Sequence, residues 1–269
     1  MVYRSKLKGI ICALALAVSS LTQAENIGNL GTEQDDESSG YFQIGFAGGW
    51  ADRPLEGDFN DFGGLVIEGR YEWNNAFVEL TSDSIGVPGF AIGYELWENP
   101  NWAVDLVAIP VQGELNPRDI ERLENSNLRK REGLTLTGVR ATRFFNEFIL
   151  QGHLLPLGRG TVVSIAAGKF WQIKNWNISA LAALRYNSSE VNQRSWDVTA
   201  IEASIDFPEY QSGSDVNAML QLRAEYPITE NWVAESTLFY TSVGDSIYDS
   251  PLVAKRQAKG IAFEISYVF

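Results

Sequence analysis

The chain has 269 residues, of which 45% are hydrophobic and 20% charged, with a mean hydropathy of −0.11 and a formal net charge of −13. This composition excludes wholesale disorder and a coiled coil, and the mean hydropathy excludes a bundle of apolar membrane helices. The acidic balance excludes a typical nucleic-acid binder, which needs a basic face to contact phosphates. One cysteine excludes an intramolecular disulfide, and one histidine leaves little for a zinc site.

The first 24 residues are predicted to be a secretory signal peptide. Arg4, Lys6 and Lys8 precede an apolar run at 9–18, which small and polar residues follow up to Ala24. This order is typical of export signals, and the run is shorter than the roughly 20 residues that a membrane-spanning helix needs. Residues 25–40 are polar and acidic, and we expect a flexible periplasmic leader there, before a single domain at 41–269.

From Tyr41 onward, apolar and polar residues alternate with a period of two, which is typical of β-strands with two different faces. In 216–226, for example, Leu220 and Leu222 fall on one face and Arg223 and Glu225 on the other. We therefore predict about twelve strands, near 41–50, 63–73, 76–82, 89–97, 102–112, 133–143, 148–155, 161–171, 176–186, 214–226, 232–242 and 257–269.

Short and long connections alternate between these strands. The short turns lie near 74–75, 98–101, 145–147, 172–175 and 227–231, and the longer loops at 51–62, 83–88, 113–132, 156–160, 187–213 and 243–256. Short turns at one end and long loops at the other are typical of outer-membrane barrels, which close because lipid cannot satisfy open strand edges. The sequence thus predicts an all-β fold, a transmembrane antiparallel β-barrel with short periplasmic turns and long extracellular loops.

Two segments leave the number of strands open between ten and fourteen. Asn116 and Pro117 favour the start of a short helix at 116–123 within a long loop. The segment 196–207 alternates weakly, and we interpret it as an extracellular hairpin or an additional strand pair.

Tryptophan is concentrated beside the short turns. Such a ring predicts an aromatic girdle at one membrane interface, where indole buries its apolar body and keeps its N–H hydrated. The six residues of this predicted girdle are Trp73, Trp97, Trp102, Trp171, Trp176 and Trp232.

The sequence offers little for catalysis. Outer-membrane lipid hydrolases generally pair Ser with His in a His-x-Ser arrangement, but Leu155 follows His153 at that spacing. We predict that His153 lies in the lumen or at its rim. The inward-facing carboxylates and arginines predict ion pairs that fill the lumen rather than acid–base catalysis. These residues are Glu68, Arg70, Glu72, Glu95, Asp105, Arg185, Arg223, Glu225, Glu235 and Glu264. We expect no enzyme activity, cofactor or metal site.

The C-terminal third carries a family resemblance. Tyr226-Pro-Ile-Thr-Glu-Asn-Trp232 and Gly244-Asp-Ser246 precede Asp249-Ser250-Pro251-Leu252-Val253 and a glycine-led final strand that ends in Tyr267-Val-Phe269. These residues resemble the MipA/OmpV family, that of the MltA-interacting protein. The resemblance implies a protein in the outer membrane of a Gram-negative bacterium. It also implies a scaffold that joins a lytic transglycosylase to a penicillin-binding protein, although other members are regarded as porin-like proteins or adhesins.

Three functions are therefore kept as hypotheses. The first is a non-enzymatic scaffold for murein hydrolase and synthase machinery, in contact with its partners through the periplasmic turns and the leader. The second is a narrow channel through the lumen, and the third is surface binding through loops 113–132 and 187–213.

The last strand carries an expected assembly signal. Tyr267 and Phe269 lie on the same face of the alternating strand as Phe263 and Ile265, and a terminal aromatic of this kind resembles the signal that the barrel assembly machinery recognises. Recognition by strand addition would pair the backbone with an exposed edge and place alternate side chains in pockets.

Overall fold

The computed structural model is a closed antiparallel β-barrel of twelve strands, and it describes residues 38–52, 61–80, 89–111, 127–131 and 133–269. Each strand pairs with its neighbours in sequence, and β1 closes the barrel against β12. The strands are β1 (Ser38–Asp52), β2 (Asp61–Trp73), β3 (Ala76–Leu80), β4 (Phe90–Asn99), β5 (Trp102–Val111), β6 (Leu134–Phe144), β7 (Phe148–Leu157), β8 (Val162–Ile173), β9 (Trp176–Asn187), β10 (Asp215–Pro227), β11 (Trp232–Ser242) and β12 (Gln257–Val268). The predicted fold class is confirmed.

The outer face of the strands is apolar, and the buried charged side chains of the strands lie in the interior. On β10, Leu220 and Leu222 are 55% and 45% exposed on the outer face, whereas Arg223 and Glu225 are buried inside. On β12, Phe263 and Ile265 lie outside, and Glu264 lies inside. An exposed apolar belt over a buried polar interior suits a barrel whose outer solvent is lipid.

The short turns follow local backbone chemistry. Asn74 and Asn75 both have positive φ, at 47° and 66°, and they join β2 to β3 as a two-residue hairpin. Asparagine tolerates this left-handed region, and two such residues in succession match the twist of the flanking strands. A bulge on β4 between Glu95 and Trp97 leaves Leu96 and Trp97 both exposed.

Glycine allows β1 and β12 to approach closely where the barrel closes. A Cβ on Gly45 would lie 2.6 Å from the carbonyl oxygen of Ile265 and 2.7 Å from the Cβ of Ser266. Gly45 is therefore a site of close backbone approach where β1 meets β12.

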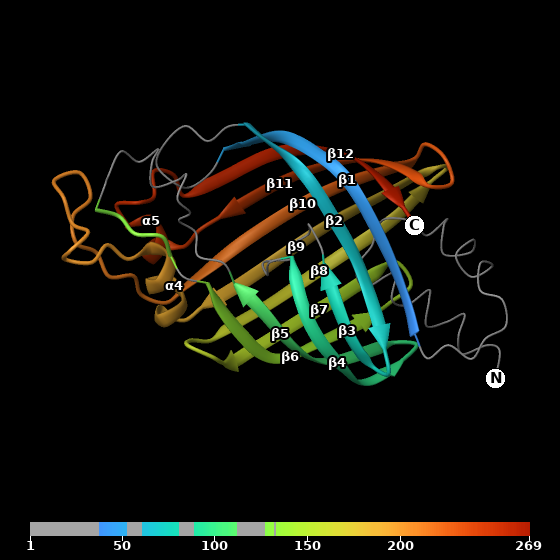
Figure 1. The fold of residues 1–269 in the computed structure, drawn as a ribbon, viewed down its shortest axis with the longest axis horizontal. Helices are drawn as coiled ribbons and strands as arrows, with labels where there is room; N and C mark the ends of the chain where they lie inside the picture. Colours follow the sequence, from blue (N-terminus) through green and yellow to red (C-terminus); the bar gives the residue numbers. More distant parts are fainter. Residues whose placement is uncertain (1–37, 53–60, 81–88, 112–126, 132) are drawn as a thin grey trace.

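Two short helices, α4 (Ser189–Trp196) and α5 (Asp245–Tyr248), lie among the long connections, at the end of the barrel opposite the C-terminus (Figure 1). Among the described residues, no helix is long and apolar enough to cross a membrane.

The segment 196–207 was predicted as a hairpin or an additional strand pair, and the structure corrects this. Trp196 ends α4, and the only strand-like pairing nearby is one isolated bridge between Val198 and Tyr210. The predicted alternation fails because Trp196, Val198 and Phe207 pack into a loop core instead of separating lipid from lumen. β1 begins at Ser38, within the predicted leader 25–40. The predicted signal peptide and the predicted helix at 116–123 lie outside the described residues.

Candidate functional site in the barrel interior and the loop cap

A row of polar side chains runs around the interior from β4 to β10. Each residue of this row lies directly opposite the next one on the neighbouring strand, and the residues of the row from Glu95 to Ser164 are buried. Such rows follow from the antiparallel ladder, in which directly opposed residues point to the same face. In order, the row is Glu95, Asp105, Arg140, His153, Ser164, Arg185 and Asn217.

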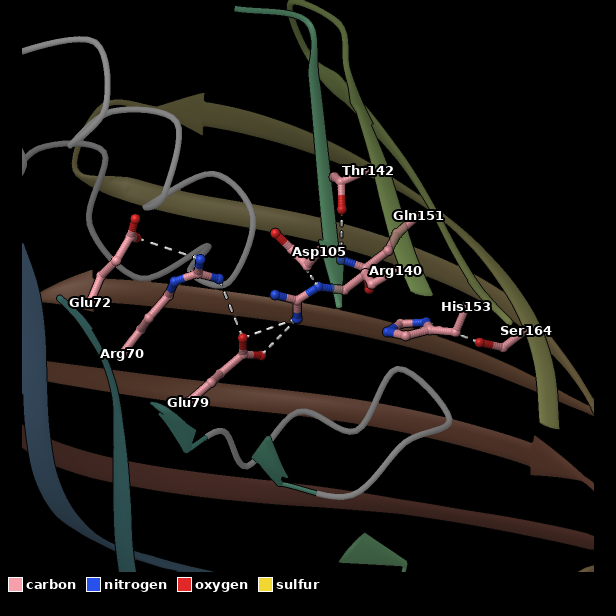
Figure 2. A network of polar contacts seen from close by, with 9 residues as sticks. All are labelled: Arg70, Glu72, Glu79, Asp105, Arg140, Thr142, Gln151, His153 and Ser164. Carbon is pink, nitrogen blue, oxygen red and sulfur yellow. Dashed lines mark hydrogen bonds and ion pairs between the residues drawn. The ribbon is translucent and has the colours of Figure 1, made fainter. Parts of the chain in front are cut away.

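Arg140 is the centre of a buried network of ion pairs (Figure 2). Its Nε lies 2.8 Å from Asp105 Oδ2, and its Nη1 lies 3.0 Å from Glu79 Oε2. Arg70 Nη1 approaches the same Glu79 oxygen at 3.5 Å, and the Arg70 guanidinium stacks 3.9 Å from the centroid of the Phe77 ring. The network therefore ties together β2, β3, β5 and β6 across the lumen, because each buried charge has a partner on another strand.

His153 lies inside the barrel, next to Ser164. Its Nδ1 is 3.1 Å from Ser164 Oγ (Figure 2). The register places the pair between Arg140 and Arg185. Both side chains are buried, so the pair is enclosed within the filled interior. This geometry suits a hydrogen bond that braces β7 against β8.

The opposite wall of the interior is acidic. Glu225, Glu235 and Glu264 are direct neighbours across β10, β11 and β12. Arg223 Nε lies 3.2 Å from Glu235 Oε1, and its Nη1 lies 3.7 Å from Glu225 Oε1. Within the described chain, Glu264 Oε1 is buried without a hydrogen-bond partner, and no group of three or more His, Cys, Asp or Glu side chains is arranged to hold a metal ion.

An apolar cluster fills the lumen towards the long-loop end. Its members are Phe77, Ala91, Val107, Ile109, Leu136, Leu155, Val162 and Val191. Seven of these come from strands, and Val191 comes from α4. The helix thus contributes one side chain to the apolar cluster.

The long connections form a second small core, which we call the loop cap: residues 127–131, 188–214 and 243–256. Its buried residues are Leu128, Trp196, Val198, Phe207, Ile247, Leu252 and Val253. These side chains come from all three segments of the cap. The described loops at this end therefore pack together as one structured unit over the barrel.

The motif Asp249–Val253, which carried the family resemblance, lies in the loop cap. Ser250 Oγ donates a hydrogen bond to the carbonyl oxygen of Trp196 at 2.6 Å. Leu252 and Val253 are buried in the cap core, Asp249 is exposed, and Pro251 is half-buried. In this structure the motif fastens the β11–β12 connection to α4.

Glu202 braces another part of the cap. Its carboxylate accepts hydrogen bonds from the Arg129 backbone N–H at 3.0 Å and from Thr199, and it pairs with Arg131 Nη1 at 2.7 Å. Burial alone would raise the pKa of Glu202, but the bonds from Thr199 and Arg129 and the charge of Arg131 outweigh it and hold the pKa below its ordinary value. The ionised form is therefore the one that the cap stabilises.

The six tryptophans of the predicted girdle all lie on the outer surface beside the short turns. Their exposed fractions run from 37% for Trp102 to 59% for Trp73. Arg143 stacks over Trp102 at 5.0 Å, and the rings of Trp176 and Tyr226 are 5.0 Å apart. Their membrane role stays a prediction.

The two residues of the expected assembly signal belong to an aromatic chain at this end. Ring centroids are 5.4 Å apart for Trp232 and Tyr267, 4.9 Å for Tyr267 and Phe269, and 5.7 Å for Phe269 and Phe42. The Phe269 N–H also donates to the carbonyl oxygen of Phe42 at 3.0 Å. These contacts join β11, β12 and β1; recognition by the assembly machinery stays a proposal.

Sequence reasoning missed α4 and the cap core. Signals for the helix were present, because Ser188 precedes it, Glu190 lies in its first turn and Arg194 in its last. Glu79 was also missing from the list of inward charges, although it alternates with the outward Val78.

Comparison with known proteins identifies the family. Residues 44–269 match the family described as MltA-interacting protein MipA. The chain belongs to this family. The resemblance inferred from the C-terminal motifs is thus confirmed.

The similar relatives are outer-membrane proteins. OmpV of Vibrio cholerae serotype O1 is 30% identical over 88 residues, and Omp26La of Vibrio anguillarum is 28% identical over 88 residues. Each of these two matches covers 33% of this chain and 34% of the relative. This chain therefore matches about a third of the length of either relative. The MltA-interacting protein of Escherichia coli strain K12 is 22% identical over 201 residues, which are 71% of this chain and 79% of the relative. The chain is an outer-membrane β-barrel of this family.

Solved barrels are similar at low sequence identity. The NanC porin is 9% identical with a TM-score of 0.40, and the match covers 83% of this chain and 98% of the porin. A loop-deletion variant of OmpT from Vibrio cholerae is 8% identical with a TM-score of 0.39, and the match covers 87% of this chain and all of the variant.

Proposed function

We propose that this barrel is a non-enzymatic scaffold, which binds a lytic transglycosylase at its short-turn end and brings it to a penicillin-binding protein. The observation that carries the proposal is the interior, where buried ion pairs and an apolar cluster occupy the lumen. Function then belongs to the outer surfaces and the two ends. The class of partner comes from the relative named MltA-interacting protein.

The short-turn end is the surface suited to such partners. In outer-membrane barrels the short turns face the periplasm, where peptidoglycan and its enzymes lie. The turns present exposed apolar side chains, with Phe145 at 51% and Ile228 at 52% exposure. Exposed aromatic and aliphatic groups on a rigid frame are common anchors of protein interfaces.

Site-specific photo-crosslinking in cells tests the scaffold. A benzophenone amino acid at Lys174 or Ile228 is expected to capture a lytic transglycosylase, whereas the same group at Ile205 in the loop cap serves as the matched control. Capture of peptidoglycan enzymes from Ile205 alone, or from neither end, would contradict the proposal.

The channel hypothesis and the scaffold hypothesis predict different conductances for the purified barrel. Charges that are paired and buried across the lumen leave little room for a hydrated path, so the purified barrel is expected to conduct weakly in planar bilayers. A steady porin-like conductance would favour the channel over the scaffold.

A specific observation favours surface binding as a second candidate function. Ile201 and Ile205 are 72% and 99% exposed on the braced loop cap. Exposed apolar groups on a structured loop are typical of a binding site. If the cap binds surfaces, Ile205→Asp should reduce attachment of cells, and Asp206→Asn should leave it unchanged.

A further inference from the structure

The outer wall of the barrel has an apolar groove between β7 and β11. The groove has a volume of about 450 Å³ and is lined by side chains and backbone of β7, β8, β9, β10 and β11. Ala167, Ala180 and Ala182 face outwards there, so their small side chains form the floor. Phe148 stands at one side, and Leu220, Leu222, Leu238 and Tyr240 stand at the other.

The register shows how this groove is built. Lys169 pairs with Ala180, Ala180 with Leu222, and Leu222 with Leu238. In the neighbouring outward row, Ala167 pairs with Ala182 and Ala182 with Leu220. Two adjacent rows therefore have alanine at their centres and large side chains at their ends, which hollows the wall between β8 and β9.

A pair of opposite charges lies at the short-turn end of the groove. Lys169 Nζ is 3.9 Å from Glu147 Oε2, and the two side chains are 34% and 66% exposed. The Lys169 ammonium also lies 4.8 Å from the centroid of the Phe148 ring and 5.2 Å from that of Trp171, which fixes its position. Phe170 N–H donates to the Glu147 carbonyl oxygen at 3.0 Å and holds the turn beside it.

We propose that this groove binds a zwitterionic aminophospholipid of the periplasmic leaflet. One acyl chain lies on the alanine floor, the lipid phosphate meets the Lys169 ammonium, and the lipid ammonium meets the Glu147 carboxylate. An exposed ion pair at 3.9 Å is weak on its own, so both groups are available to oppositely charged groups of a headgroup. An apolar groove beside two opposite charges at the interface matches this lipid in both shape and charge.

Shape disfavours a second copy of the chain as the occupant. Two copies in one membrane are related by an axis along the membrane normal, which brings the same surface patch of each copy together at the same depth. The alanine floor of one copy would then face the alanine floor of the other, and the hollow between them would stay unfilled. An acyl chain fills this hollow.

Photolabelling in vesicles tests the site. The full barrel is refolded into vesicles of phosphatidylethanolamine and phosphatidylglycerol, with a diazirine on the acyl chain of one lipid at a time. With labelled phosphatidylethanolamine, adducts are expected to concentrate on peptides that contain 163–171 and 178–184. Even labelling around the barrel wall would overturn the proposal.

Variants separate the groove from the headgroup contacts. Ala182→Leu fills the floor and is expected to reduce groove labelling several-fold, whereas Ala234→Leu, at an outward alanine outside the groove, is the control for folding and bulk. Glu147→Gln is expected to shift labelling from phosphatidylethanolamine towards phosphatidylglycerol, and Lys169→Gln to weaken both. An unchanged lipid preference in Glu147→Gln, or protein–protein crosslinks that Ala182→Leu removes, would overturn the assignment to this lipid.

Discussion

At the scale of single residues, Arg140 is a buried cation that two carboxylates share. It faces both Asp105 and Glu79, and all three side chains are buried. Arg140→Met would leave two buried carboxylates without their shared cation, and removing one member of a buried pair costs about 3–5 kcal/mol. We expect a loss of this size in the free energy of unfolding, measured by denaturant titration in lipid vesicles.

A compensated variant is the control for Arg140. When Glu79→Gln and Asp105→Asn accompany Arg140→Met, the two carboxylates that Arg140 faces become neutral, and Arg70 keeps Glu72 as its charged partner at 3.5 Å. Most of the lost stability should return. If the triple variant is as unstable as Arg140→Met, packing of the Arg140 side chain rather than its charge stabilises the interior.

Leu222 tests which face of β10 meets lipid. Its side chain is 45% exposed on the outer wall, and Gln221 beside it points inwards. An arginine on the lipid face costs roughly 2–4 kcal/mol near the bilayer midplane. Leu222→Arg should therefore reduce the yield of refolding into vesicles far more than Gln221→Arg, as judged by the gel shift of folded barrels. Equal losses would contradict the face assignment.

The sequence predicted which way a side chain faces where a strand has lipid on one face and the lumen on the other. Arg223 and Glu225 were predicted to face inwards because Leu220 and Leu222 occupy the other face, and the structure agrees. Their partners were not predictable, because the cross-strand register that brings Arg223 to Glu235 is fixed by the three-dimensional pairing. The Arg70–Glu79–Arg140 network was missed because Glu79 and Arg140 were absent from the predicted inward charges, and because its contacts depend on the three-dimensional pairing of the strands.

At the scale of elements, the strands and the loop cap follow different rules. The twelve strands were predictable within a few residues because lipid and lumen impose a period of two on each of them. Inside the cap, no such contrast exists: Trp196 and Val198 are buried on all sides by other loops. The period of two therefore does not predict strands there, and the hairpin predicted at 196–207 does not form.

Ser250 connects two elements of the cap, and it can be tested without disturbing the barrel. Ser250→Ala removes the hydrogen bond to the Trp196 carbonyl, and leaving a buried acceptor unpaired costs about 1–3 kcal/mol. We expect faster hydrogen exchange and proteolysis within 188–214, while the melting temperature of the strands stays unchanged. Asp249→Ala, in the same motif but at an exposed residue, is the control and should leave both measurements as they are. Equal exchange in the two variants would mean that Ser250 does not fasten the cap.

At the scale of the whole molecule, the barrel places its two ends in different environments. One end carries the short turns and the aromatic chain from Trp232 to Phe42, and the other carries the loop cap (Figure 1). The twelve strands form an even number, so the start of β1 and the end of β12 lie at the same end. Partners of the short turns and partners of the cap cannot therefore be reached from the same side of the membrane.

This arrangement predicts the orientation of the barrel in the outer membrane. In barrels of this class the short turns face the periplasm, so the loop cap should face outwards.

Three single-cysteine variants test this orientation, with the cysteine at Ile205 in the cap or at Asn74 or Ile228 in the short turns. In intact cells, a membrane-impermeant maleimide should modify the cysteine at Ile205 and miss the other two. All three should react once the outer membrane is permeabilised, which controls for burial of the thiols. Labelling at Asn74 and Ile228 but not at Ile205 in intact cells would show the reverse orientation. It would also contradict the assignment of the scaffold surface to the periplasm and of the Lys169–Glu147 pair to the periplasmic leaflet.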